Sequence, residues 1–79
     1  MKARITVTLK TGVLDPQGKA IEAALKSLGI PGIEGVRQGK VFDLEVSAAD
    51  QATAQETLKA ACEKLLANTV VENYAIEIA

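Results

Sequence analysis

Hydrophobic and polar residues alternate strictly at the start of the chain. The inward positions of this alternation are Ile5, Val7 and Leu9. The positions between them are polar, namely Arg4, Thr6, Thr8 and Lys10. A period of two is typical of a strand with one buried face, so the pattern predicts a first strand here.

A helix is predicted after this strand, because its start, its apolar stripe and its end are all marked. Asp15 suits the N-cap, where a carboxylate accepts free backbone N–H groups, and Pro16 suits the first helical position. Gly29 is expected to end the helix, and Pro31 and Gly32 prevent its continuation. The apolar stripe, at helical spacing, consists of Ala20, Ile21, Ala24, Leu25 and Leu28.

The middle of the chain is predicted to form a β-hairpin. Its strands would be residues 34–37 and residues 41–46, with Gly39 supplying the positive φ that the turn needs. The inward residues of the second hairpin strand are Phe42, Leu44 and Val46. The register of the first hairpin strand stays open.

A second helix and a final strand complete the pattern. The helix is expected to start near Ser47, which forms a capping-box pattern with Asp50, and to end near Asn68. Its apolar stripe consists of Ala54, Leu58, Ala61, Cys62, Leu65 and Leu66. The last strand would bury Tyr74, Ile76 and Ile78.

The element order β-α-β-β-α-β is that of the split βαβ, or ferredoxin-like, sandwich. We therefore expect an α+β fold in a single domain, residues 1–79, with a four-stranded antiparallel sheet and both helices on one face. The opposite face would carry short or polar residues, namely Arg4, Thr6, Thr8, Asp43, Glu45, Asn73, Ala75 and Glu77. This architecture serves many functions, so the fold does not choose one.

Composition restricts the class of protein further. The chain has 79 residues and a net charge of −1, with no Trp, one Phe and one Tyr. A core this small adds little stability, so we expect a homodimer or a higher homo-oligomer. Neither a basic run nor an aromatic pair favours nucleic acid. No segment resembles a membrane span or a secretory signal, so the expected location is the cytoplasm.

Residues with catalytic chemistry are scarce. The chain has no His, which is the commonest general base and metal ligand. Its one cysteine, Cys62, lies in an apolar stripe and is interpreted as a small buried hydrophobe. Asp43 and Glu45 are interpreted as an exposed acidic row that Arg4 or Lys10 can complement. We expect no catalytic residue and no metal ligand.

The loop from Lys10 to Gly18 leads into a helix N-terminus, a type of site that attracts phosphate. Asp15 already places a negative charge there and Pro16 removes one donor, so a structural or docking loop is the favoured interpretation. Arg37 and Lys40 are most simply solvated charges of the hairpin, although such a turn can also contact an acidic partner.

Several strings of the chain, taken in order, are similar to a known family. They are residues 7–10, 12–18, 24–29, 36–42 and 66–74. The specific signature combines Lys10, the tetrapeptide Asp15-Pro16-Gln17-Gly18, and Arg37 followed by Gly39-Lys40. Together they resemble the PurS subunits of phosphoribosylformylglycinamidine (FGAM) synthase.

The resemblance implies a non-catalytic subunit of an ATP- and glutamine-dependent ligase complex in purine biosynthesis. It would bridge a PurQ-type glutaminase, which releases ammonia, and a PurL-type synthetase, which converts formylglycinamide ribonucleotide to the amidine. The complex would use ATP and Mg²⁺, and this chain would bind no cofactor. The implied partner-binding residues are Lys10, Asp15, Pro16, Gln17, Gly18, Arg37, Gly39 and Lys40.

Two other classes share the topology. An amino-acid-binding regulatory module would use a glycine-containing loop, for which Gly12 or Gly18 is suitable. A small hydrolase like the acylphosphatases would need an arginine in the loop after the first strand, and this loop has none.

Overall fold

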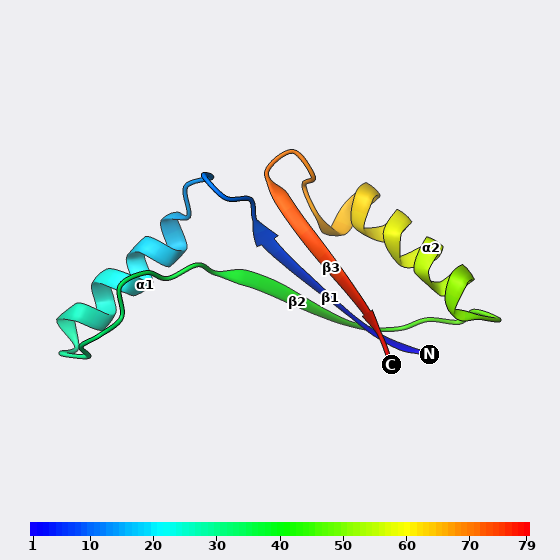
Figure 1. The fold of residues 1–79 in the computed structure, drawn as a ribbon, viewed down its shortest axis with the longest axis horizontal. Coiled ribbons are helices and arrows are strands. Elements are labelled where there is room, and N and C mark those ends of the chain that lie inside the picture. Colours follow the sequence, from blue (N-terminus) through cyan, green and yellow to red (C-terminus); the bar gives the residue numbers. More distant parts are fainter.

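The fold is described for all residues, 1–79, by a computed structural model. Its elements are β1 (Lys2–Leu9), α1 (Pro16–Ser27), β2 (Gly39–Glu45), α2 (Gln51–Ala61), a π-helical turn (Cys62–Leu66) and β3 (Glu72–Ile78). The strands form one antiparallel sheet in the order β2-β1-β3 (Figure 1). The expected α+β class is confirmed, but the sheet has three strands, so the expectation of four is wrong.

The missing strand is the first half of the expected hairpin. Residues 34–37 form no strand, and the chain from the end of α1 runs back beside the helix to β2 (Figure 1). The positive φ expected at Gly39 is also absent, because the glycines with positive φ are Gly12, Gly29 and Gly32. Gly39 is instead the first residue of β2, where an added Cβ would lie 2.6 Å from the carbonyl oxygen of Val7.

The core lies between the sheet and α2. Ile5 of the central strand β1 is fully buried, and it faces Phe42 on one side and Ile76 on the other. The buried hydrophobic residues are Ala3, Ile5, Val7, Val46, Ala54, Leu58, Cys62 and Ala67. The alternation in β1 and β3 therefore predicted the buried side of the sheet correctly.

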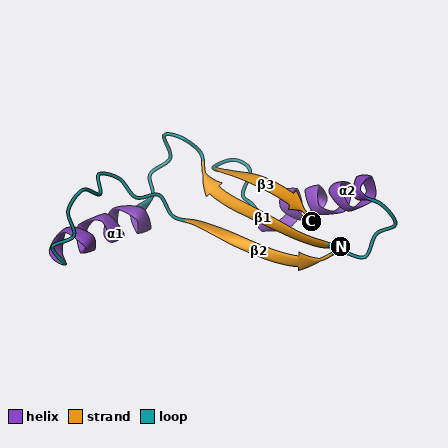
Figure 2. Cartoon of the chain, turned by 60° about the horizontal axis from the view of Figure 1, so that its bottom comes forward, coloured by secondary structure: helices purple, strands orange, loops and turns teal.

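Helix α1 lies away from this core, so the expectation that both helices cover one face of the sheet is wrong. It projects beyond one end of the sheet, whereas α2 packs against β3 (Figures 1 and 2). The molecule measures 51 × 25 × 15 Å and has a radius of gyration of 16.0 Å. A compact chain of this length would have a radius of about 12 Å, so the fold is markedly elongated.

The helix ends are set largely by the residues that the sequence marks. Asp15 is the N-cap of α1, and Gly29, just past its end, has a φ of 75°. The start of α2 is displaced from Ser47, because Asp50 is the N-cap and accepts a hydrogen bond from the Thr53 N–H at 2.7 Å. Neither helix is long and apolar enough to cross a membrane.

The apolar stripe of the second helix is confirmed except at one position. Ala54, Leu58 and Cys62 are buried, but the side chain of Leu65 is 82% exposed. The chain forms a π-helical turn at this point, in which the Ala67 N–H bonds to the carbonyl of Cys62. A π turn holds more residues than an α turn, so Leu65 rotates off the buried stripe.

Candidate functional site

The residues that the sequence marked as partner-binding gather at one end of the sheet. Lys10 directly follows β1, the segment Asp15–Gly18 caps and begins α1, and Arg37 precedes Gly39 and Lys40, the first residues of β2 (Figure 1). We call residues 10–18 and 36–40 the junction. We call α1 together with the returning segment 28–35 the arm. The junction is the only place where both ends of the arm join the sheet.

Asp15 is the most buried polar residue of the junction, with 5% of its surface exposed. Its Oδ1 accepts the N–H of Gly18 at 2.8 Å, which is the expected cap of α1. Its Oδ2 accepts the N–H of Gln38 at 2.7 Å. These two backbone donors hold the pKa of the Asp15 carboxyl below its usual range, Gln38 having the larger effect. One carboxylate therefore caps the helix and also binds the chain that returns from it.

Gly18 is required in the junction by a close approach. Its φ is not positive, so backbone freedom is not the reason. A Cβ at this position would overlap the carbonyl oxygen of Val36 and would lie 2.8 Å from Asp15 Oδ2. Only a residue without a side chain lets the first turn of α1 lie against the backbone of Val36.

Arg37 makes two hydrogen bonds within the chain. Its Nη1 donates to the carbonyl oxygen of Val13 at 2.8 Å, and its Nη2 donates to that of Lys10 at 3.2 Å. A guanidinium offers several donors in a planar fork, and a lysine amine cannot reproduce that geometry. Arg37 is exposed, as expected for a solvated charge, but its donors also satisfy carbonyl groups of the loop between β1 and α1.

Lys40 also has a partner within the chain. Its Nζ lies 3.9 Å from Oε2 of Glu72, which lies on β3 across the central strand. The Lys40 side chain is 56% exposed, and that of Glu72 is 15% exposed. An ion pair this long and this exposed contributes little to stability, so the amine of Lys40 is still accessible to another protein.

The remaining marked residues differ in exposure. Pro16 and Gln17 are exposed on the first turn of α1, whereas Lys10 is half-buried and its N–H donates to the carbonyl of Val71 at 2.9 Å. Binding of a partner by any of the marked residues stays a prediction. What the structure shows is that Asp15, Gly18 and Arg37 hold the junction together.

The apolar surface of the arm was not foreseen from the sequence. The α1 stripe was expected to face the sheet, but no strand packs extensively against α1. The large hydrophobic residues left exposed in this part of the chain are Leu14, Ile21, Leu28, Ile30 and Ile33. Scattered apolar side chains are normal on a protein surface, but a continuous group marks a contact site.

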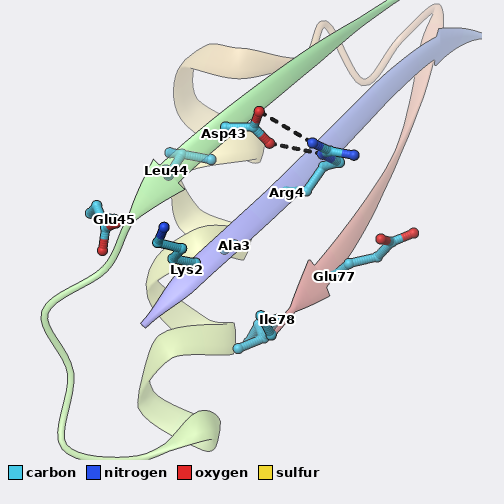
Figure 3. A pocket seen from close by; sticks show the side chains of 9 residues that line it. Lys2, Ala3, Arg4, Asp43, Leu44, Glu45, Glu77 and Ile78 are labelled. Carbon is cyan, nitrogen blue, oxygen red and sulfur yellow. Dashed lines mark hydrogen bonds and ion pairs between the residues drawn. The ribbon is translucent and has the colours of Figure 1, made fainter.

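The outward face of the sheet is polar, as expected. Arg4 Nε donates to Asp43 Oδ1 at 2.8 Å, and Glu77 faces Arg4 from β3 (Figure 3). The guanidinium lowers the pKa of the Asp43 carboxyl. These residues border a shallow hollow of about 560 Å³. The hollow opens widely to solvent and its charges already face one another, so it carries no argument for a bound ligand.

Cys62 fits its interpretation as a buried hydrophobe. It is fully buried beneath the sheet, and burial raises the pKa of its thiol, with a further increase from the charge of Glu63. Nowhere do three or more His, Cys, Asp or Glu side chains gather closely enough to hold a metal ion.

Comparison with known proteins gives one consistent result. The family described as "PurS: Phosphoribosylformylglycinamidine (FGAM) synthase" matches residues 2–79. The PurS subunit of FGAM synthase from Synechocystis sp. is 51% identical over 75 residues, which cover 95% of this chain and 75% of that protein.

Two solved structures extend this likeness to the fold. PurS of Methanocaldococcus jannaschii, described as one of the subunits of formylglycinamide ribonucleotide amidotransferase in the purine biosynthetic pathway, aligns with a TM-score of 0.86 and 36% identity. That match covers 96% of this chain and 92% of the other. A chain of PurLQS from Thermotoga maritima aligns with a TM-score of 0.89 and 39% identity, covering 96% of this chain and 93% of that one.

Proposed function

Because this chain belongs to the PurS family, we propose that it is the small subunit of FGAM synthase in purine biosynthesis. The observation that carries the proposal is its likeness, over nearly the whole length, to a chain of the T. maritima PurLQS structure. Its partners are a PurL-type synthetase and a PurQ-type glutaminase. The likeness includes the projecting arm, because a TM-score of 0.89 over 96% of the chain leaves little room for a different placement of α1.

The chain acts as an adaptor between the two other subunits. Ammonia released from glutamine is largely protonated at neutral pH, and ammonium is not a nucleophile. Holding the glutaminase against the synthetase raises the local concentration of ammonia at its acceptor. Under this proposal ATP and Mg²⁺ act in the other subunits, and this chain supplies docking surfaces and no catalytic group.

The chain works as a homo-oligomer, and the exposed arm supports this part of the proposal. Helix α1 has 12 residues, and isolated helices shorter than about 12–15 residues are marginal in water. Packing of its apolar side would therefore add to the stability that the Asp15 cap already supplies in the single chain. Ile21 on α1, Leu28 at its C-cap, and Ile30 and Ile33 after it are exposed in the single chain.

A second copy of this chain provides the matching surface. Helix α2 packs against β3, and no helix packs extensively on β2. Phe42 and Leu44, the inward residues of β2, are only half-buried. In a two-fold symmetric dimer, the arm of each copy covers the β2 side of the other copy's sheet. This contact removes the apolar side of the arm and the half-buried residues of β2 from water. The partner surface of the arm is thus a second copy of the chain.

Reconstitution tests the function. The synthetase and glutaminase subunits are assayed for amidine formation from glutamine, and separately from ammonium chloride, with and without this chain. We expect glutamine-dependent activity to require the chain, whereas ammonia-dependent activity of the synthetase does not. Equal glutamine-dependent activity in its absence would overturn the proposal. Saturable binding of a free amino acid by the isolated chain would then favour a regulatory module.

A further inference from the structure

The direction of the arm must be set at the junction. Helix α1 makes no extensive contact with any strand. Its one buried residue is Gly18, in the first turn. Beyond that turn, no residue of the helix is fully buried, and no other helix or strand packs extensively on it. Interactions at its base therefore decide where its apolar side points.

Three residues at this base join the segment that leads into α1 (the outgoing side, residues 10–18) to the segment that leaves the arm (the returning side, residues 36–40). Asp15 lies on the outgoing side and accepts the N–H of Gln38 on the returning side at 2.7 Å. Arg37 lies on the returning side, and its Nη1 donates to the carbonyl of Val13 on the outgoing side at 2.8 Å. Between them, Gly18 lies directly against the backbone of Val36. A side chain from each segment thus binds the backbone of the other segment.

The chemistry of these contacts makes the base rigid. Hydrogen bonds with a charged donor or acceptor are stronger than neutral ones, and both ionic side chains here use two of their atoms. Asp15 is nearly inaccessible to water, which strengthens its bonds further. Contacts spread over two chain segments restrict rotation of the helix more than a cap on one segment does.

We propose that Asp15, Gly18 and Arg37 are positioning residues that set the direction of α1 before a second copy binds. This inference rests on the self-association proposed above. An arm held in its binding direction loses little freedom on association. If the arm points correctly in only a fraction of molecules, the apparent dissociation constant rises in inverse proportion to that fraction. A looser base therefore weakens self-association without changing any residue of the contact surface.

Single-molecule fluorescence energy transfer tests this in the free chain. Dyes are attached to Ser27→Cys at the end of α1 and Thr57→Cys on the exposed side of α2, in a Cys62→Ala background. Helices α1 and α2, which carry these positions, lie toward opposite ends of the molecule (Figure 1). The labelled chain is diluted until its transfer signal no longer changes with concentration, so that the signal reports the arm of the dissociated chain. Excess unlabelled chain then gives the associated form and the dissociation constant.

For the wild-type chain we expect one narrow transfer peak at the same position in the free and the associated form. For Asp15→Asn and for Arg37→Ala we expect a broad or displaced peak in the free chain. Excess unlabelled wild-type chain should restore the wild-type peak, with a dissociation constant raised at least about tenfold. Arg37→Lys should resemble Arg37→Ala, because a lysine ammonium lacks the planar fork that reaches both carbonyl groups.

Asp43→Asn is the matched control, because it removes an aspartate that pairs with Arg4 outside the junction. Its peak should be that of the wild type. A narrow, unshifted peak in both Asp15→Asn and Arg37→Ala would overturn the proposal, as would a broad peak in the free wild-type chain. Arg37 is exposed, so we expect Arg37→Ala to fold. This variant therefore tests the proposal even if Asp15→Asn, at a buried position, does not fold. The result does not depend on synthase activity, so a failure of the adaptor function is recognised separately.

Discussion

Asp15 and Gln38 lie 23 positions apart in the sequence, and their contact closes the base of the arm. The same carboxylate caps α1 through Gly18. A residue that looks like a local helix cap thus also holds a tertiary contact. The strings that mark the family are in large part the residues that build this contact and the arginine fork beside it.

Acid should loosen the junction. The N–H groups of Gln38 and Gly18 hold the pKa of the Asp15 carboxyl below its usual range. A lowered pKa in the folded state adds stability that is fully present above the unfolded-state pKa, about 3.9 for Asp. This stability is lost as the pH falls through the lower, folded-state value. We expect the free energy of unfolding of the wild type to drop below about pH 4, and that of Asp15→Asn to drop less steeply.

Urea unfolding at a series of pH values measures this difference. Asp43 and Asp50 also have lowered pKa values and are present in both proteins, so they contribute equally to the two curves. If the free energy of unfolding depends on pH in the same way in the wild type and in Asp15→Asn, titration of Asp15 does not contribute to stability.

A methyl group at position 18 should be poorly tolerated. A Cβ there would overlap the carbonyl oxygen of Val36, and a backbone atom cannot move aside as a flexible side chain can. We expect Gly18→Ala to lower the free energy of unfolding by about 3 kcal/mol. Gly35→Ala is the control, because nothing lies within 4 Å of a Cβ at that position and its φ is not positive. Equal stability of the two variants in urea would contradict the close packing described for the junction.

A charge on the apolar side of α1 should prevent self-association. Ile21 is 39% exposed in the single chain and lies on the apolar stripe. We expect Ile21→Asp to raise the dissociation constant by at least about 100-fold, because an unpaired carboxylate would be buried in the contact. Ala23 is exposed and lies on the opposite side of the helical wheel, so Ala23→Asp should self-associate normally. Sedimentation equilibrium distinguishes the two, and similar values for both would exclude the α1 stripe as the contact.

Lys40 should contribute to docking on the other subunits. Its amine is exposed and its ion pair with Glu72 is long, so it is available to an acidic surface. We expect Lys40→Ala to keep the fold and to weaken binding of the synthetase about tenfold, about 1.4 kcal/mol. Glutamine-dependent turnover at limiting subunit concentration should fall, while ammonia-dependent turnover stays constant. Lys59→Ala on α2 is the charge-matched control, and an equal effect of both variants would rule out a specific contact at Lys40.

Cys62 should be unreactive in the folded chain. It is fully buried and its thiol has a raised pKa, whereas the thiolate is the form that alkylating reagents attack. We expect negligible carboxymethylation by iodoacetamide at neutral pH and full modification in denaturant, measured by mass spectrometry. Rapid modification of the native chain would contradict the packing of α2 on the sheet.

The elements themselves could be predicted because their signals are local. Alternation in β1 requires only neighbouring residues, and Asp15 with Pro16 marks a helix start within one turn. Errors arose where a local pattern competed with a distant contact. Residues 34–37 read as a strand, but Gln38 donates to Asp15 and the segment follows the arm. The displacement of Leu65 depends on a π turn that its helical spacing does not reveal.

The sequence by itself determined the periodicity of the strands and helices, the caps of α1, the buried position of Cys62 and the family. Only the tertiary structure decided that α1 projects from the sheet and that Arg37 binds two backbone carbonyls of the chain. The physical reason is the range of the interactions. Periodicity and capping act over a few residues, whereas the direction of a helix depends on hydrogen bonds between segments more than 20 residues apart, as for Arg37 and Val13.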